Sequence, residues 1–197
     1  MSDAARQVLL RALFFAFSGA TMPAITLPTT VESTPTTFTP AFPFVSQAND
    51  FDDVLAITGM LSLGALKTSE EVRQLAIAKV RHPVRGPYFY SEERIAALLA
   101  QIQLVASVYE DVAKVSDIPD VALLVIDYIP DMDVGRHILF HRAKATHASG
   151  TTIEYALDPL PGIPPAERVR TDIKNLIGRG TWAIAVHPMK TKAGTGK

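Results

Sequence analysis

Three histidines lie close together in the chain and are the first candidates for chemistry. His137, His141 and His147 carry imidazoles, which often bind metal ions, and two histidines four residues apart on a helix form a metal pair. Residues 137–142 have the pattern of a strand, in which side chains four residues apart share a face but stand about 13 Å apart. One ion does not bridge that distance, so we predict no metal site and no cofactor unless a helix or loop brings the histidines together.

Three aspartates form a second candidate group. Asp127, Asp131 and Asp133 lie on either side of Pro130, at the end of an apolar run and just after it. Carboxylates bind Mg²⁺ and Ca²⁺, but a calcium loop of the EF-hand type needs further acidic positions and a closing glutamate. Aspartate is also a favoured turn residue. We interpret the three as turn residues and keep as an alternative a dispersed enzyme site that they form with His141.

Basic side chains on a strand and on the helix expected after it could contact nucleic-acid phosphates. Arg136, Arg142 and Lys144 are separated by even numbers of residues, so a regular strand points all three to one face and the histidines His137 and His141 to the other. The candidates on the following helix are Arg168, Arg170 and Lys174. The alternative is a solvated face that forms ion pairs with Glu154, Glu167 and Asp172. RNA binding depends on this local patch, because the net charge is only −1.

No short motif of a known reaction occurs in the sequence. It contains neither a G-x-S-x-G elbow nor a glycine-rich phosphate loop, and residues 194–197 lack the strand and helix that such a loop requires. The absence of cysteine excludes disulfides, thiolate nucleophiles, zinc-finger cores and iron–sulfur ligation. We therefore predict that the chain is not an enzyme.

Two helices in the middle of the chain are predicted from capping residues and apolar period. The first follows Thr68, which has capping-box spacing to Glu71, and ends at residues 81–83. The second runs from Ser91 to about Lys114 and is expected to be the core helix. Its apolar stripe has steps of three and four residues: Ile95, Leu98, Leu99, Ile102, Val105, Tyr109 and Val112.

Two further helices are expected at either side of this region. Residues 51–65 fit a short helix or a strand, and we favour the helix, although Gly59 limits its length. Pro164 and Pro165 can open a last helix that runs through Ile177.

Apolar runs broken by turn residues predict strands after residue 117. The runs are 121–126, 137–142, 151–156 and 180–187. Short turns separate the first three, which is typical of an antiparallel meander. The predicted fold class is α+β: an antiparallel β-meander packed with three main helices, preceded by an extended N-terminal arm.

The first part of the chain suggests contact with another surface. Leu9, Leu13, Phe14 and Phe17 recur at helical spacing, and we expect this apolar stripe to dock on the same domain or on a neighbouring subunit. A cleaved signal peptide is the alternative, although Arg11 interrupts the apolar run, which is too short to span a membrane. The proline- and threonine-rich residues that follow, up to residue 45, predict an extended arm or edge strand, or else a surface linker.

The predicted organisation has three regions. They are a helix with an arm over residues 1–45, an α+β core domain over residues 46–187, and a flexible basic tail over residues 188–197. Low net charge reduces self-repulsion and favours association.

These features together favour a self-assembling structural subunit. We expect a homo-oligomer, most simply a viral coat or nucleocapsid-type protein that contacts RNA phosphates and resides in the virion. The alternatives are a small cytoplasmic enzyme with a dispersed Asp/His site, or a secreted binding module if residues 1–20 are a signal peptide.

Overall fold

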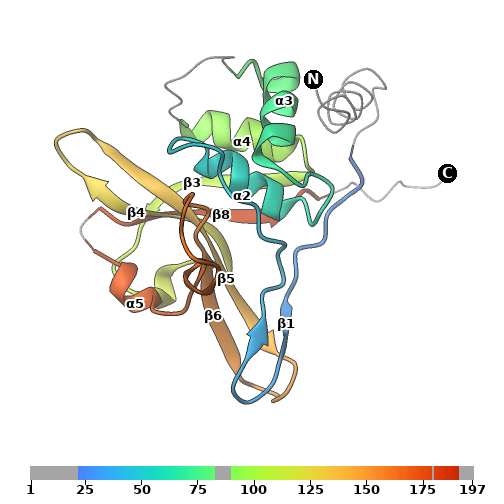
Figure 1. The fold of residues 1–197 in the computed structure, drawn as a ribbon, viewed down its shortest axis with the longest axis vertical. Coiled ribbons are helices and arrows are strands. Elements are labelled where there is room, and N and C mark those ends of the chain that lie inside the picture. The colour runs from blue at the N-terminus through green and yellow to red at the C-terminus, as the bar shows by residue number, and fades with distance from the viewer. Residues whose placement is uncertain (1–21, 83–89, 179, 191–197) are drawn as a thin grey trace.

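The computed structural model describes residues 22–82, 90–178 and 180–190. In this part of the chain the fold is mixed α and β, with eight strands in one sheet and four α-helices (Figure 1). The mixed class predicted from the sequence is confirmed. The predicted N-terminal helix, with Leu9, Leu13, Phe14 and Phe17, and the tail beyond residue 190 lie outside the described residues.

The centre of the sheet consists of three consecutive antiparallel strands. They are β4 (Val121–Ile129), β5 (Val134–Ala145) and β6 (Thr152–Leu157). This part of the predicted meander is therefore present. The last strand, β8 (Trp182–Pro188), returns to pair with β4 instead of extending the meander beyond β6.

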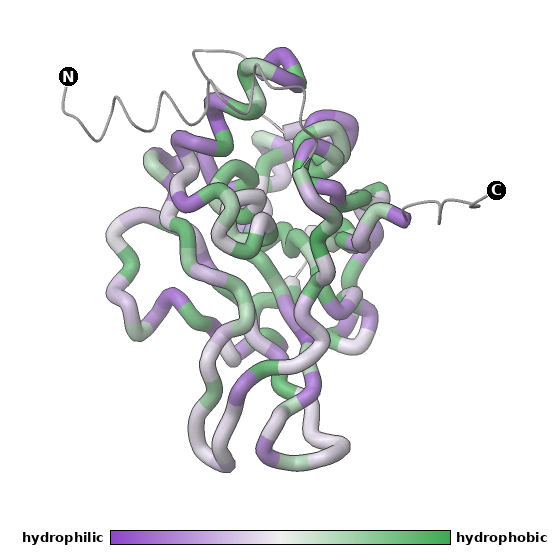
Figure 2. Tube along the Cα trace, turned by 90° about the vertical axis from the view of Figure 1, so that its right-hand side faces the viewer, coloured by the Kyte–Doolittle hydropathy of each residue, from purple (hydrophilic) through white to green (hydrophobic). Residues whose placement is uncertain are grey.

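The long apolar run of β4 reflects burial on both faces. Val121 and Leu123 belong to a core beneath the helices, whereas Leu124 and Ile126 belong to a second core on the opposite face. Side chains alternate between the faces of a strand, so both sets must be apolar. Figure 2 shows hydrophobic residues concentrated where the helices meet the sheet.

The proline- and threonine-rich segment packs on its own chain from residue 22 onward. β1 (Thr30–Ser33) pairs in parallel with the end of β5 and antiparallel with β2 (Phe38–Thr39). Val31, Phe42 and Val45 are buried in the core beneath the helices. The segment is extended, as expected from its composition.

Three helices cover one face of the sheet: α2 (Asp53–Leu61), α3 (Ser69–Val80) and α4 (Glu92–Ala100) (Figure 1). Every residue of α2 is buried, which explains why its sequence shows no polar face. The predicted cap of α3 is confirmed, because the Thr68 side chain accepts a hydrogen bond from the Glu71 amide. No helix in the described residues is both long and apolar enough to cross a membrane.

The prediction of one helix from Ser91 to Lys114 is wrong beyond residue 100. α4 ends at Ala100, Gln103 adopts a left-handed conformation, and β3 (Leu104–Asp111) then pairs with β8. A β-bulge between Ala106 and Tyr109 shifts the strand alternation. The apolar residues therefore lost the period of two and resembled a helical stripe.

The predicted helix over residues 164–177 is also wrong. This region contains a 3₁₀ turn (Pro165–Glu167), the short strand β7 (Val169–Arg170) and the single-turn α5 (Ile173–Leu176). β7 pairs with the end of β6. Strand pairing and the ion pairs of Arg170 supply contacts that the local helical signal did not include.

Candidate functional site

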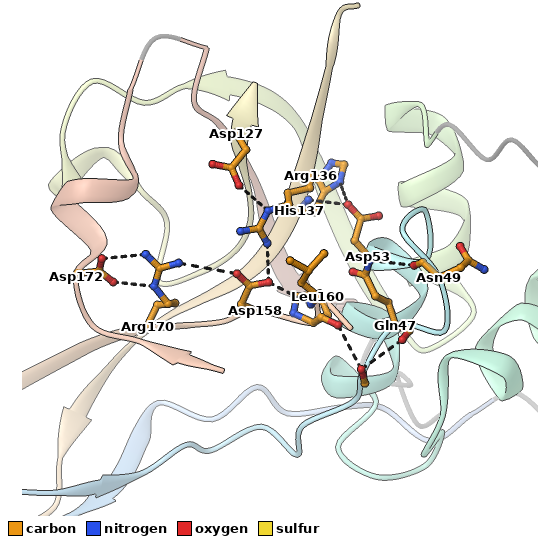
Figure 3. A network of polar contacts seen from close by, with 12 residues as sticks. Gln47, Asn49, Asp53, Asp127, Arg136, His137, Asp158, Leu160, Arg170 and Asp172 are labelled. Carbon is orange, nitrogen blue, oxygen red and sulfur yellow. Dashed lines mark hydrogen bonds and ion pairs between the residues drawn. The ribbon is translucent and has the colours of Figure 1, made fainter. Parts of the chain in front are cut away.

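Two networks of polar side chains meet at the beginning of β5 (Figure 3). Arg136 and His137 are neighbours on this strand and point to opposite faces of the sheet. His137 points toward α2 and Arg136 toward the segment after β6. The two faces of β5 thus hold two separate polar networks.

The network on the helix side is an Asp–His–Tyr chain. His137 Nδ1 lies 2.9 Å from Asp53 Oδ2, and His137 Nε2 lies 2.7 Å from the Tyr109 hydroxyl. Asp53 also accepts hydrogen bonds from the backbone amides of His137, at 2.6 Å, and Val54, at 2.7 Å. One carboxylate therefore joins the start of α2 to β5, and the histidine continues the contact to β3.

The protonation states follow from these contacts. Burial, together with the charges of Asp53 and Glu92, raises the pKa of Tyr109 far above its ordinary value of 10.0. Tyr109 therefore keeps its proton, and its hydroxyl forms a hydrogen bond with His137 Nε2. The ionised Asp53 carboxylate can only accept, so His137 Nδ1 donates to it. Burial opposes ionisation of Asp53, but the charge and hydrogen bonds of His137 outweigh it and lower the Asp53 pKa below 3.8.

The order carboxylate, imidazole, hydroxyl is that of a nucleophilic triad. A phenol whose pKa is raised is a weak nucleophile, however, because its anion is disfavoured. The hydrogen bonds of this chain instead connect α2, β5 and β3, and each of the three side chains has a partner. The sequence marks His137 as a candidate but gives no sign of its partners Asp53 and Tyr109, which lie 84 and 28 residues from it along the chain.

The network on the other face is a row of alternating charges. The buried Asp158 accepts a hydrogen bond of 2.6 Å from Arg136, and Arg170 Nη1 lies 4.0 Å from its second oxygen. Arg136 also pairs with Asp127 at 2.6 Å, and Arg170 pairs with Asp172 at 2.9 Å. Burial works against the charge of Arg136, but the two carboxylates outweigh it and raise its pKa.

The six predicted phosphate contacts fall into two groups. Arg136, Arg142 and Arg170 form ion pairs with carboxylates, and Arg142 lies 2.8 Å from Glu154. These pairs match the alternative of a solvated, paired face at Glu154 and Asp172. The other group consists of Lys144, Arg168 and Lys174, for which the described residues include no carboxylate within ion-pair distance. Nucleic-acid contact stays a prediction for all six.

The three clustered histidines have separate partners. His141 is buried, and its ring contacts the Tyr155 hydroxyl and the Pro28 carbonyl oxygen, each at 2.9 Å. His147 Nδ1 lies 2.8 Å from the Ser33 hydroxyl. In the part of the chain that the structure describes, no three His, Asp or Glu side chains gather as a metal site would require.

His141 is fixed in one tautomer by its neighbours. The Pro28 carbonyl can only accept, so Nε2 carries the proton and Nδ1 accepts from Tyr155. Burial lowers the pKa of His141 below 6.5 and raises that of Tyr155 to about 12. The Tyr155 oxygen also accepts a hydrogen bond from the Ala41 amide at 2.8 Å, which ties the segment after β2 to β6.

Tyr155→Phe is expected to lower the free energy of unfolding by about 1–3 kcal/mol, because it leaves the Ala41 amide and His141 Nδ1 without a partner. Urea unfolding of the purified variant measures the change. Tyr128→Phe is the matched control, since its hydroxyl donates to the exposed Asp133 and its loss should cost about 0.5 kcal/mol or less. Equal losses in the two variants would contradict this account of the core.

The three predicted turn aspartates lie around the β4–β5 turn. Asp127 pairs with Arg136, Asp133 accepts from Tyr128 at 2.8 Å, and Asp131 is exposed. Asp127 and Asp133 adopt left-handed backbone conformations, with φ of 54° and 50°. His141 pairs with Val121 at the other end of the β4–β5 ladder, so the structure does not bring it together with these aspartates.

An open pocket of about 280 Å³ lies between the segment after β2 and the β6–β7 region. It is lined by Pro40, Phe42, Phe44, Leu157, Pro165, Arg168 and Val169. The Arg168 guanidinium lies over the Phe44 ring, 4.7 Å from its centroid, and its Nε donates to the Ile163 carbonyl. The pocket is therefore apolar with one cation in its wall.

Comparison of the chain with protein-family models, with curated proteins and with solved structures found no match in any of the three. Its class is therefore defined by the fold alone: mixed α and β, with eight strands in one sheet over the described residues.

Proposed function

We propose that this chain is a self-assembling structural subunit of the viral coat or nucleocapsid type. The observation that carries the proposal is the outer edge of β3, which is the outermost strand at one end of the sheet. No strand in the described residues pairs with that edge. An unpaired strand edge presents backbone donors and acceptors to a strand of another chain. On β3 the Tyr109 amide already donates to Glu92 of α4 at 2.7 Å, so the other backbone groups of this edge would form the pairing.

The length of β3 sets it apart from the other ends of the sheet. β3 has 8 residues, whereas β2 and β7 have 2 each. Very short edge strands are a common means of preventing association, and a long edge strand lacks that protection. This difference supports β3 as the pairing edge between copies.

The side chains of β3 add apolar surface beside this edge. Val105 and Val108 are 44% and 61% exposed, although valine is most often buried. Within the bulge between Ala106 and Tyr109, the Ser107 hydroxyl accepts from the Ala185 amide of β8. The strand is thus held firmly to the sheet on its inner side while it presents valines to solvent.

Contact with nucleic-acid phosphates is the second part of the proposal. Lys144 and Lys174 support it best, because the paired arginines would have to exchange carboxylate for phosphate and the Arg168 guanidinium lies over the Phe44 ring. Two cations per subunit give appreciable affinity only when many subunits line one nucleic acid, so packaging would follow from assembly.

The double variant Val105→Lys/Val108→Lys is expected to reduce the solution mass from that of a large assembly to the 21.3 kDa of one chain. Two cations on this face would meet like charges from the neighbouring copy and would lose the apolar contact. Light scattering after size-exclusion chromatography measures the mass. Phe51→Lys is the control, because it makes the same change at a residue that is 51% exposed outside the sheet. An assembly unchanged by the double variant would exclude the β3 edge.

A further inference from the structure

The turn between β4 and β5 forms an apolar tip on a projecting hairpin. Figure 1 shows this hairpin extending from the body, on the side away from β1. Ile129 and Met132 are 49% and 67% exposed there. Asp131 and Asp133 flank Met132, and Asp131 has no cationic partner among the described residues. The tip therefore combines apolar surface with uncompensated negative charge.

The pocket of about 280 Å³ has the complementary character. Its walls are prolines, phenylalanines and aliphatic side chains, and its one charged residue is Arg168. The Phe44 ring and the Ile163 carbonyl hold the Arg168 side chain in place, and no carboxylate in the described residues pairs with it. A pre-positioned guanidinium beside an apolar pocket suits an apolar side chain that is followed or preceded by a carboxylate.

We propose that the β4–β5 tip of one copy inserts Met132 into this pocket of a second copy, with Asp131 beside Arg168. The inference rests on the proposed function, since it supplies an interface for the assembly. An apolar cavity of about 150 Å³ already accepts benzene, so this pocket has room for an unbranched methionine side chain. Methionine adapts to irregular apolar surroundings and makes favourable contacts with aromatic rings.

The symmetry of such a contact has a direct consequence. The tip and the pocket are different surfaces, so the interface is head-to-tail, and each added copy still presents a free tip and a free pocket. Head-to-tail contacts produce rings or filaments rather than closed dimers. Pairing through β3 would join neighbouring rows, so the two interfaces together are sufficient for an extended array.

Thiol cross-linking tests the interface directly, because the full chain contains no cysteine. Pro130→Cys places a thiol on the tip without removing Met132, and Ala166→Cys places one beside the pocket. We expect a short thiol cross-linker to give a dimer when the two single variants are mixed. A chain that carries both Pro130→Cys and Ala166→Cys should give a series of cross-linked oligomers of increasing size. Pro130→Cys mixed with Thr36→Cys, an exposed site on the β1–β2 turn, is the control and should give background yield.

Charge exchange makes the test specific for the proposed pair. Asp131→Arg is added to the Pro130→Cys variant, or Arg168→Asp to the Ala166→Cys variant. Either change alone is expected to reduce the cross-linking yield of the mixture about tenfold, which corresponds to about 1.4 kcal/mol. Mixing the two changed variants should restore the yield, because the charges are then exchanged across the interface. A yield equal to the control, in a protein that light scattering shows to be assembled, would overturn the tip-and-pocket interface and leave the proposed function standing. A chain that remains at 21.3 kDa would overturn both.

Discussion

Asp158→Ala is expected to lower the free energy of unfolding by about 3–5 kcal/mol, because it removes the shared anion of two arginines. The Asp158 side chain is 0% exposed and accepts hydrogen bonds from Arg136, at 2.6 Å, and from the Leu160 amide, at 3.2 Å. Without it, the partly buried guanidinium of Arg136 keeps only its outer partner, Asp127. Removing the inner partner of a partly buried charge costs more than the ion pair contributes when intact.

The matched control removes the other carboxylate from the same arginine. Asp127 is 65% exposed, so Asp127→Ala should cost about 1 kcal/mol or less. Urea unfolding of both variants, with unchanged m-values, measures the two losses. Similar losses would show that burial of Asp158 does not determine its contribution, and would contradict the account of this network.

Asp53→Ala is expected to cost about 3 kcal/mol, because one change removes the acceptor of three donors. The donors are the amides of Val54 and His137 and the His137 ring, all within 2.9 Å of the carboxylate. The variant removes the hydrogen bonds between α2 and β5, and the His137 ring that contacts Tyr109 is then no longer held by Asp53. Asp50→Ala, an exposed carboxylate in the preceding turn, is the control and should change the free energy of unfolding by about 0.5 kcal/mol or less.

The same carboxylate gives a pH dependence of known sign. The pKa of Asp53 in the folded chain lies below its ordinary value of 3.8. Its ionised form therefore stabilises the fold fully above about pH 4, and this contribution is lost as the pH falls through the lower folded pKa. Asp53→Asn should lack that part of the acid dependence, so the stability difference from wild type should shrink as the pH falls below 3.8. A stability difference between Asp53→Asn and wild type that stays constant below pH 3.8 would contradict the assignment of this acid dependence to Asp53.

Local signals in the sequence were sufficient for some elements and not for others. Thr68 and Glu71 start α3 because a cap depends only on nearby residues. Strands β4, β5, β6 and β8 were predicted within a few residues, since their apolar runs end at turn residues. The helix predicted beyond Ala100 was wrong, because pairing with β8 and the bulge after Ala106 determine the structure there instead of the local apolar period.

The partners of the candidate site residues could not be predicted for a related reason. The sequence shows that His137 and Arg136 are polar residues on one strand, but their partners come from other elements. Asp53 begins a helix 84 residues away, and Asp158 follows β6. A lone aspartate at a helix start has an ordinary role in capping, so no local signal marks it as part of a buried network.

The solution mass of the full-length chain, measured together with its ultraviolet absorbance spectrum, tests the central claim most directly. We expect a uniform particle many times heavier than the 21.3 kDa chain, with added absorbance from bound nucleic acid if packaging is part of its role. A large particle without that absorbance would keep assembly and remove packaging. A stable monomer of 21.3 kDa at high concentration would contradict self-assembly.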